Sequence, residues 1–257
     1  MDIYFDKEDT IPNLEVAMTI ALILAGGLGL RMNDEGNQPK QFYTLGEKPI
    51  IIHTLEKFSL HPMINAICVV CLHTWEDYLR DLINKFGLKK INWITSGGDS
   101  RQASVFQGLC LLENVCSLHD IVVVHDGVRP FVTSSLIKRS ITTTETLGNA
   151  MTSIRCTDTL LNSPDGKTAS YAMERNNTYS VQTPQTYRLG YGLALYRRAY
   201  ELGKTETINC CELFIELGET IYMINGRKNN IKLTTRDDID YLKYLNTIMN
   251  TSSDDDE

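Results

Sequence analysis

Short apolar runs alternate along the first half of the chain with segments whose apolar residues recur at helical spacing. Each apolar run has the length of one buried strand, and the runs occupy residues 19–25 (TIALILA), 66–72 (AICVVCL), 91–96 (INWITS) and 121–126 (IVVVHD). The segments with helical spacing occupy residues 49–62, 74–87 and 100–115. This alternation predicts βαβ units, and therefore an α/β fold with a mostly parallel, Rossmann-like sheet and helices on both faces.

The pattern becomes shorter and more polar beyond about residue 150. Residues 151–161, 166–175 and 178–188 predict short strands that form an arm or a second small sheet, and residues 194–204 predict a helix. The end of the chain predicts a strand, a loop, a second strand (IKLTT, 231–235) and a helix. In that helix Thr235 is expected at the N-cap, with Asp237 and Asp238 near the positive end of the dipole.

The termini differ from the rest of the chain in composition. Residues 1–17 are predicted to be an N-terminal extension, residues 18–248 the main domain, and residues 249–257 a disordered acidic tail. No apolar run is long enough to cross a membrane, and the acidic N-terminus lacks the apolar core of a secretory signal. We therefore expect a soluble, cytoplasmic protein without a membrane partner.

Charge and cysteine content narrow the function classes. The formal net charge of −7 over 257 residues argues against a nucleic-acid partner, which a basic face would accompany. The seven cysteines lie mostly in apolar segments and are expected to be buried thiols. Cys68 and Cys71 form a CxxC within a predicted strand, where positions three apart face opposite sides, so a metal or redox site is not expected there.

The glycine-rich loop after the first strand, LAGGLGLRM, carries the clearest chemical signal. Gly26, Gly27 and Gly29 allow the backbone to approach a ligand, and exposed amides at such a turn bind anions. The loop lacks the GK[ST] ending of a phosphate-binding P-loop, and the dinucleotide pattern fails because Met32 stands where a glycine is required. Arg31 and Lys40 follow, so residues 24–40 predict a nucleoside triphosphate site.

Three further segments carry candidate chemistry, two of them at predicted strand ends. Gly97 and Gly98 form a turn before Asp99 and Ser100, which either cap the next helix or contact a ligand. The carboxylate of Asp126 ends a buried strand and suits magnesium, which needs only one or two carboxylates beside phosphate oxygens.

The chemical roles considered for Asp126 and Lys232 each have a structural alternative. Arg129 offers Asp126 an ion pair in place of the metal. Lys232 lies in an apolar segment, either at a sheet edge or directed into a cleft.

In their order and spacing these segments resemble the 2-C-methyl-D-erythritol 4-phosphate cytidylyltransferases and the closely related ribitol 5-phosphate cytidylyltransferases. The similar motifs are LAGGLGLRM, QPKQF, GGDSRQASV, HDGVRPF, Asp158–Thr159, Glu174–Arg175, VQTPQ and NNIKLTT, between about residues 19 and 245. The resemblance implies one Rossmann-like domain with a protruding β-arm, about residues 153–180, that reaches over a partner subunit in a homodimer.

The resemblance also implies a site for CTP and a polyol phosphate, with magnesium as cofactor held by Asp126. The implied catalytic residues are Arg31, Lys40 and Lys232. The implied nucleotide-binding residues are Leu24, Ala25, Gly26, Gly27, Gly29, Gly98, Asp99, Ser104, Asp126 and Gly127. The implied acceptor-binding residues are Thr159, Arg175, Thr183 and Asn229, with Arg175 able to serve the neighbouring subunit.

Such an enzyme requires positive charge rather than a base. The acceptor's phosphate attacks the α-phosphorus of CTP and pyrophosphate leaves, and a phosphate monoester with a second pKa near ~6 is already largely a dianion. His125 is therefore expected to be structural.

The motifs divide between the two branches of the family. GGDSRQASV, HDGVRPF and VQTPQ favour 2-C-methyl-D-erythritol 4-phosphate, an isoprenoid precursor, as the acceptor, which is the main expectation. AGG, PKQF and IIHTLEKF occur in the ribitol branch, so ribitol 5-phosphate, giving CDP-ribitol for cell-surface polymers, is the alternative. Many members carry Asp where Asn209 and Asn229 stand here. A uridylyl- or guanylyltransferase and a non-catalytic nucleotide-binding relative are further alternatives.

Overall fold

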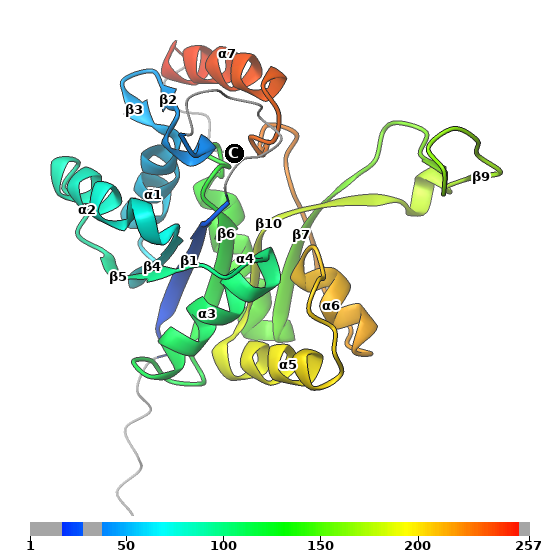
Figure 1. Cartoon of the computed structure of the whole chain (residues 1–257), viewed down its shortest axis with the longest axis horizontal. Coiled ribbons are helices and arrows are strands. Elements are labelled where there is room, and N and C mark those ends of the chain that lie inside the picture. Colours follow the sequence, from blue (N-terminus) through cyan, green and yellow to red (C-terminus); the bar gives the residue numbers. More distant parts are fainter. Residues whose placement is uncertain (1–16, 28–37, 252–257) are drawn as a thin grey trace, which may run out of the picture.

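A seven-stranded sheet forms the centre of the computed structural model, which describes residues 17–27 and 38–251 (Figure 1). Its strands are β1 (Thr19–Ala25), β4 (Ala66–Cys71), β5 (Ile91–Ser96), β6 (Ile121–Asp126), β7 (Asn149–Arg155), β10 (Tyr179–Arg188) and β11 (Met223–Asn225). They lie in the order β11-β7-β10-β6-β1-β4-β5, and β10 alone of the seven runs antiparallel to its neighbours. The predicted α/β fold with a mostly parallel sheet is confirmed.

Helices cover both faces of the sheet because its central strands are apolar on both sides. Ile20 and Leu22 pack against the helices of one face, α3 (Arg101–Glu113), α5 (Leu189–Glu201) and α6 (Cys210–Glu216). Ala21 and Ile23 pack against those of the other, α1 (Ile50–Leu60), α2 (Glu76–Lys85) and α4 (Ser134–Leu147). Cys68 and Cys71 fall into these two opposite clusters, as the strand periodicity predicts.

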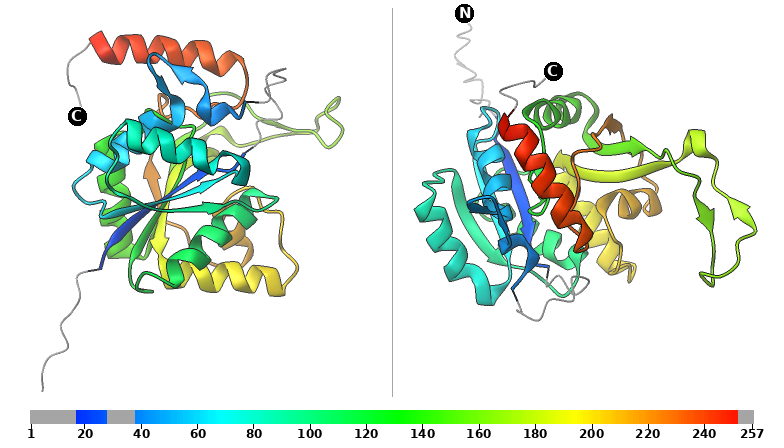
Figure 2. Two further views of the ribbon diagram at one scale, coloured as in Figure 1. Left: turned by 60° about the vertical axis from the view of Figure 1, so that its left-hand side comes forward. Right: turned by 90° about the horizontal axis from the view of Figure 1, so that it is seen from above.

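A smaller layer lies over the carboxyl ends of the strands. It consists of the hairpin β2 (Thr44–Leu45) and β3 (Lys48–Pro49) and of α7 (Asp237–Thr251), which share an apolar cluster containing Leu45, Leu242 and Leu245. Figure 2 shows α7 lying across the top of the sheet. The helix continues to Thr251, past the predicted domain end at residue 248, while the extension 1–16 and the tail 252–257 lie outside the described residues.

Two predictions for the C-terminal part were wrong in detail. Residues 231–234 form no strand, because they pack beneath α7 instead of joining the sheet. Asp237 and Asp238 lie in the first turn of α7 as predicted, but the Thr235 hydroxyl donates instead of capping as an acceptor. The carboxylate of Asp238 accepts hydrogen bonds from the amides of Thr234 (2.7 Å) and Thr235 (2.8 Å) and from that hydroxyl. This cap holds the segment that carries Lys232.

The arm projects far from the sheet (Figures 1 and 2). The sequence predicted short strands in an arm or a second small sheet, and the structure shows an arm whose base is formed by two long strands of the main sheet, β7 and β10. They leave the sheet as a pair joined through Arg155 and Tyr179. The arm ends in β8 (Leu161–Asn162), β9 (Tyr171–Ala172) and the 3-10 turn η4 (Arg175–Asn177). Among the helices of the described part, none is long and apolar enough to cross a membrane.

Candidate active site

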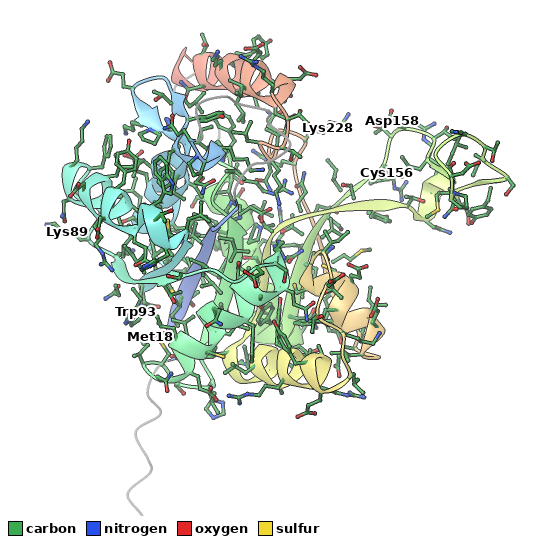
Figure 3. All side chains as sticks on the ribbon, in the orientation of Figure 1. Met18, Lys89, Trp93, Cys156, Asp158 and Lys228 are labelled. Carbon is green, nitrogen blue, oxygen red and sulfur yellow. The ribbon has the colours of Figure 1, made fainter. Side chains whose placement is uncertain are left out.

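The carboxyl ends of the parallel strands bring the predicted chemical motifs to one edge of the sheet. Met18, directly before β1, lies at the opposite end of the molecule from α7 (Figure 3). The loops that follow β1, β5 and β6 therefore all open toward the α7 side, where ligands bind in α/β sheets of this kind.

The loops after β1 and β5 meet over the start of α3. A Cβ added to Gly26 would lie 3.7 Å from the Ser104 hydroxyl and 3.8 Å from the Cα of Gly97. The Ser104 hydroxyl accepts from the Gly98 amide (3.2 Å), and Ser100 caps α3 by accepting from the Ala103 amide (3.0 Å). Gly98 is required for packing as well, because a Cβ there would lie 2.5 Å from that of Ala103. Gly26, Gly98 and Ser104 are thus brought together, with Asp99 exposed beside them.

Lys40 lies in the 3-10 turn η2 (Lys40–Phe42), which is tied to the start of the glycine-rich loop. The buried amide of Gln41 donates a 2.6 Å hydrogen bond to the carbonyl of Ala25. Phe42 stacks on Trp75 with ring centroids 4.9 Å apart, which holds the turn from behind. Sequence reasoning missed Gln41, because a polar residue in a loop carries no sign of its burial. Gly29 and Arg31 lie outside the described residues.

Asp126 is the electrostatic centre of this edge. Its Oδ2 lies 3.1 Å from Lys232 Nζ and 3.1 Å from Arg129 Nε, and its Oδ1 lies 3.5 Å from a terminal nitrogen of Arg101. Burial alone would raise the pKa of Asp126, but the cations of Lys232, Arg101 and Arg129 lower it well below its ordinary value. The carboxylate is therefore ionised, and the predicted ion pair with Arg129 is present.

A buried hydrogen-bonded chain supports Asp126 from behind. The backbone amide of Asp126 donates to the Thr183 hydroxyl (3.1 Å), which lies 3.0 Å from Nδ1 of His125, while Nε2 of His125 lies 3.2 Å from the carbonyl of Arg129. Since that carbonyl only accepts, Nε2 carries the proton and Nδ1 accepts from Thr183. Burial lowers the pKa of His125 to about 3, so the ring is neutral at pH 7. His125 is structural, as expected.

Two predicted ligand contacts are instead occupied by the protein itself. The Thr183 hydroxyl has both partners just described, and the residue is 2% exposed, so in this structure the hydroxyl proton is donated to His125. Gly127 donates its amide to the carbonyl of Leu24 (2.9 Å) and accepts from the Thr54 hydroxyl (2.9 Å). A Cβ at Gly127 would lie 2.6 Å from Ile51, so this glycine serves packing between β6 and α1.

The loop before Lys232 fixes that lysine against Asp126. The buried side-chain amide of Asn230 donates to the carbonyl of Thr183 (2.8 Å), and the backbone carbonyl of Asn230 accepts from Arg129 (2.7 Å). The Leu233 amide donates to the carbonyl of Val128 (3.0 Å). Asn229 is exposed and accepts from the hydroxyl of Tyr241 on α7 (3.3 Å). Sequence reasoning chose Asn229 and missed the buried Asn230, since adjacent asparagines look alike without the fold.

The remaining substitution for Asp has a local explanation. The side chain of Asn209 accepts from the amides of Cys211 (2.9 Å) and Glu212 (3.2 Å) and so caps α6. Asn and Asp are about equally good N-caps, so the fold does not need a charge at this position.

Thr159 and Arg175 lie on the exposed arm, so one chain does not bring them to Asp126. Figure 3 shows Asp158, the residue before Thr159, and Cys156 out on the arm, whereas Lys228 lies on the loop that leads to α7. A cavity of about 490 Å³ at the foot of the arm is lined by Met151, Tyr179, Val181, Cys211, Ile215 and Met223, among others, and it contains none of the predicted site residues.

Comparison with known proteins decides the family. The family model for 2-C-methyl-D-erythritol 4-phosphate cytidylyltransferase matches residues 19–247. The chain belongs to that family. It is therefore a cytidylyltransferase, a transferase of nucleotidyl groups.

The proteins that this chain resembles carry two different names. The relatives in sequence are named for ribitol 5-phosphate, and the similar solved structures for methylerythritol phosphate. A ribitol-5-phosphate cytidylyltransferase from Lacticaseibacillus paracasei is 38% identical over 231 residues, covering 89% of this chain and 98% of that protein. One from Vibrio parahaemolyticus is 37% identical, covering 89% and 95%. The structure of 4-diphosphocytidyl-2C-methyl-D-erythritol synthase from Anaerococcus prevotii aligns with a TM-score of 0.75 at 26% identity, covering 90% of this chain and 99% of that one.

Asp126 is the buried carboxylate that the described residues offer for a metal at this edge. Among residues 17–27 and 38–251 no group of three or more His, Cys, Asp or Glu side chains converges. Within the described part of the chain, the contact of Asp126 Oδ1 is the 3.5 Å ion pair with Arg101, so this carboxylate oxygen is lightly held. One such oxygen suits magnesium, which completes its shell with phosphate oxygens and water.

Proposed function

We propose that this enzyme joins CTP to ribitol 5-phosphate, giving CDP-ribitol and pyrophosphate. The choice of acceptor is supported by the relatives, which are 35–38% identical over most of the chain and are named ribitol-5-phosphate cytidylyltransferases. This reverses the order of the two acceptors expected from the motifs. The observation that carries the nucleotidyl-transfer chemistry is the buried Asp126 with Lys232, Arg129 and Arg101 around it.

Charge neutralisation is what this arrangement offers to the reaction. Two anions must approach each other, namely the acceptor's phosphate and the α-phosphate of CTP, and fixed cations lower that barrier. Lys232 is held against Asp126, and the turn that carries Lys40 is tied to the carbonyl of Ala25 by Gln41, so the backbone that presents each cation is fixed before substrate arrives. Magnesium held by Asp126 would add neutralisation of phosphate oxygens. The buried His125 is neutral and faces the protein, so no general base is assigned.

The experiment that tests this proposal is an acceptor panel. Purified enzyme with CTP and magnesium is given ribitol 5-phosphate, 2-C-methyl-D-erythritol 4-phosphate or erythritol 4-phosphate, and pyrophosphate release is measured. We expect the highest kcat/KM with ribitol 5-phosphate as the acceptor. Pyrophosphate release should be slow when UTP replaces CTP. Turnover of the methylerythritol phosphate alone would instead support the second candidate, which the family model and the solved structures favour. If neither ribitol 5-phosphate nor 2-C-methyl-D-erythritol 4-phosphate leads to pyrophosphate release, both candidate functions are refuted.

We further propose that the site is completed by a second copy of the chain. Thr159 and Arg175 stand on the projecting arm, away from Asp126, and a homodimer would place the arm of one subunit over the other's site. Mixing the variants Arg175→Met and Lys232→Met tests this arrangement. If Arg175 acts in trans, random reassociation restores about a quarter of the wild-type sites. No recovery after subunit exchange would place Arg175 outside the partner's site.

A further inference from the structure

The guanidinium of Arg101 is the least constrained cation beside Asp126. Its one ion pair among the described residues is the 3.5 Å contact with Oδ1 of Asp126, and no hydrogen bond of its side chain lies within that part of the chain. The other groups near it are Tyr196, Cys210 and Tyr187, whose pKa values burial raises, so all three are neutral at pH 7. A side chain with five donors and one loose partner has bonding capacity left for a ligand.

The neighbouring arginine shows the contrast. Arg129 donates through Nε to Oδ2 of Asp126 (3.1 Å) and through a terminal nitrogen to the carbonyl of Asn230 (2.7 Å). Its side chain is 10% exposed, whereas that of Arg101 is 22% exposed. Arg129 therefore ties the loops of the site together, and Arg101 is the guanidinium that a ligand can reach.

The excess positive charge around Asp126 also favours the binding of an anion. Arg101, Arg129 and Lys232 surround one carboxylate, so two positive charges in this cluster lack a counter-ion among the described residues. Arg101 is moreover the first residue of α3, where the helix dipole disfavours a cation and favours an anion. Both terms are relieved when a phosphate group lies beside the guanidinium.

We propose that Arg101 is a further substrate-binding residue, which moves its guanidinium from Asp126 to a phosphate oxygen when substrate binds. The assignment rests on the proposed nucleotidyl transfer. Arg101 follows the Gly98–Asp99–Ser100 turn expected to hold the nucleoside, and it reaches toward Asp126 and the loop of Lys232. The phosphate it meets is thus the α-phosphate of the nucleotide or the acceptor's phosphate that attacks it.

The test compares wild type with two variants. Arg101→Met keeps the aliphatic part of the side chain and loses the charge, and Arg101→Lys keeps the charge and loses the planar guanidinium with its paired donors. Arg197→Met is the matched control, because it removes an exposed arginine paired with Glu113 on the outside of α5. Asp126 keeps Lys232 and Arg129 in the Arg101 variants, so all should fold, which thermal melts verify. Affinities for cytidine and CMP are measured by ligand-observed NMR, and KM for ribitol 5-phosphate by pyrophosphate release.

If Arg101 binds the α-phosphate, Arg101→Met loses about 10- to 100-fold in affinity for CMP while cytidine affinity is unchanged. If it binds the acceptor's phosphate, CMP affinity is kept and KM for ribitol 5-phosphate rises by a similar factor. Arg101→Lys should recover part of either loss, and Arg197→Met should match wild type. Retention of both phosphate affinities in Arg101→Met, or equal losses for cytidine and CMP, overturns the assignment.

Refutation of the proposed function can be told apart from refutation of the role of Arg101. Wild type that binds CMP better than cytidine but turns over no polyol phosphate would remove the proposed function and leave the role of Arg101 testable by binding alone. Wild type that binds CMP no better than cytidine, without turnover, would remove both.

Discussion

Acid should destabilise this protein through His125, and the size of the effect follows from its burial. The ring is fully buried, and its pKa falls from an ordinary value of 6.5 to about 3. Between these values the unfolded chain binds a proton that the folded chain does not, so stability rises with pH across that window and falls as pH drops from about 6.5 toward 3.

The expected loss is about 2 kcal/mol between pH 7.5 and pH 5, at about 1.4 kcal/mol per pH unit once the unfolded imidazole is fully protonated. That is a large part of the stability of a typical domain, roughly 5–15 kcal/mol. His53 and His61 contribute with the same sign, since burial lowers the pKa of each. A comparison with a variant is therefore needed to isolate His125.

His125→Gln provides that comparison, since it removes the titrating group and keeps an amide able to donate and accept. Urea unfolding of both proteins, followed by the fluorescence of Trp75 and Trp93, gives the free energy of unfolding at pH 5, 6 and 7.5. The stability advantage of wild type over the variant should shrink by about 2 kcal/mol from pH 7.5 to pH 5. An advantage that stays the same at all three pH values, or an NMR titration of His125 above pH 5, would refute the reasoning.

Three other substitutions test the geometry of the site. Gly98→Ala places a Cβ 2.5 Å from that of Ala103 and should cost about 1–3 kcal/mol in thermal or urea melts. Gly27→Ala, whose Cβ would have no described atom within 4 Å, should leave stability unchanged. Gln41→Met should lower kcat by releasing the turn that carries Lys40 from the carbonyl of Ala25. Gln38→Met, which removes an outer bond to the carbonyl of Phe42 in the same turn, should lower it less, and equal effects would contradict the role of the Gln41–Ala25 bond. Lys232→Met should lower kcat by roughly 100-fold or more. The melting temperature should stay close to that of wild type, because Asp126 keeps its ion pairs with two arginines. A kcat within twofold of wild type would show that Lys232 takes no part in the reaction.

The sequence by itself determined the sheet's central strands and the helices between them. Runs such as 20–25 and 121–124 are apolar at every position because both faces of those strands are buried, and that signal is local. It also placed the glycine-rich loop, Asp126 and Lys232 in one family pattern. Helices α4 and α6 were missed: α4 is rich in threonine and serine, and α6 is a short helix whose start is set by Asn209.

Only the tertiary structure decided which of these residues meet. Asp126 is paired with Arg101 and Lys232 from opposite sides along the chain, a convergence that depends on strand order and loop closure and leaves no local trace. The same holds for Thr183 and Gly127, whose polar groups are consumed inside the protein, and for Gln41, whose amide is needed by a carbonyl sixteen residues earlier. Hydrogen-bonding partners that are distant in sequence are set by packing, because a buried polar group must find whichever partner the fold brings within reach.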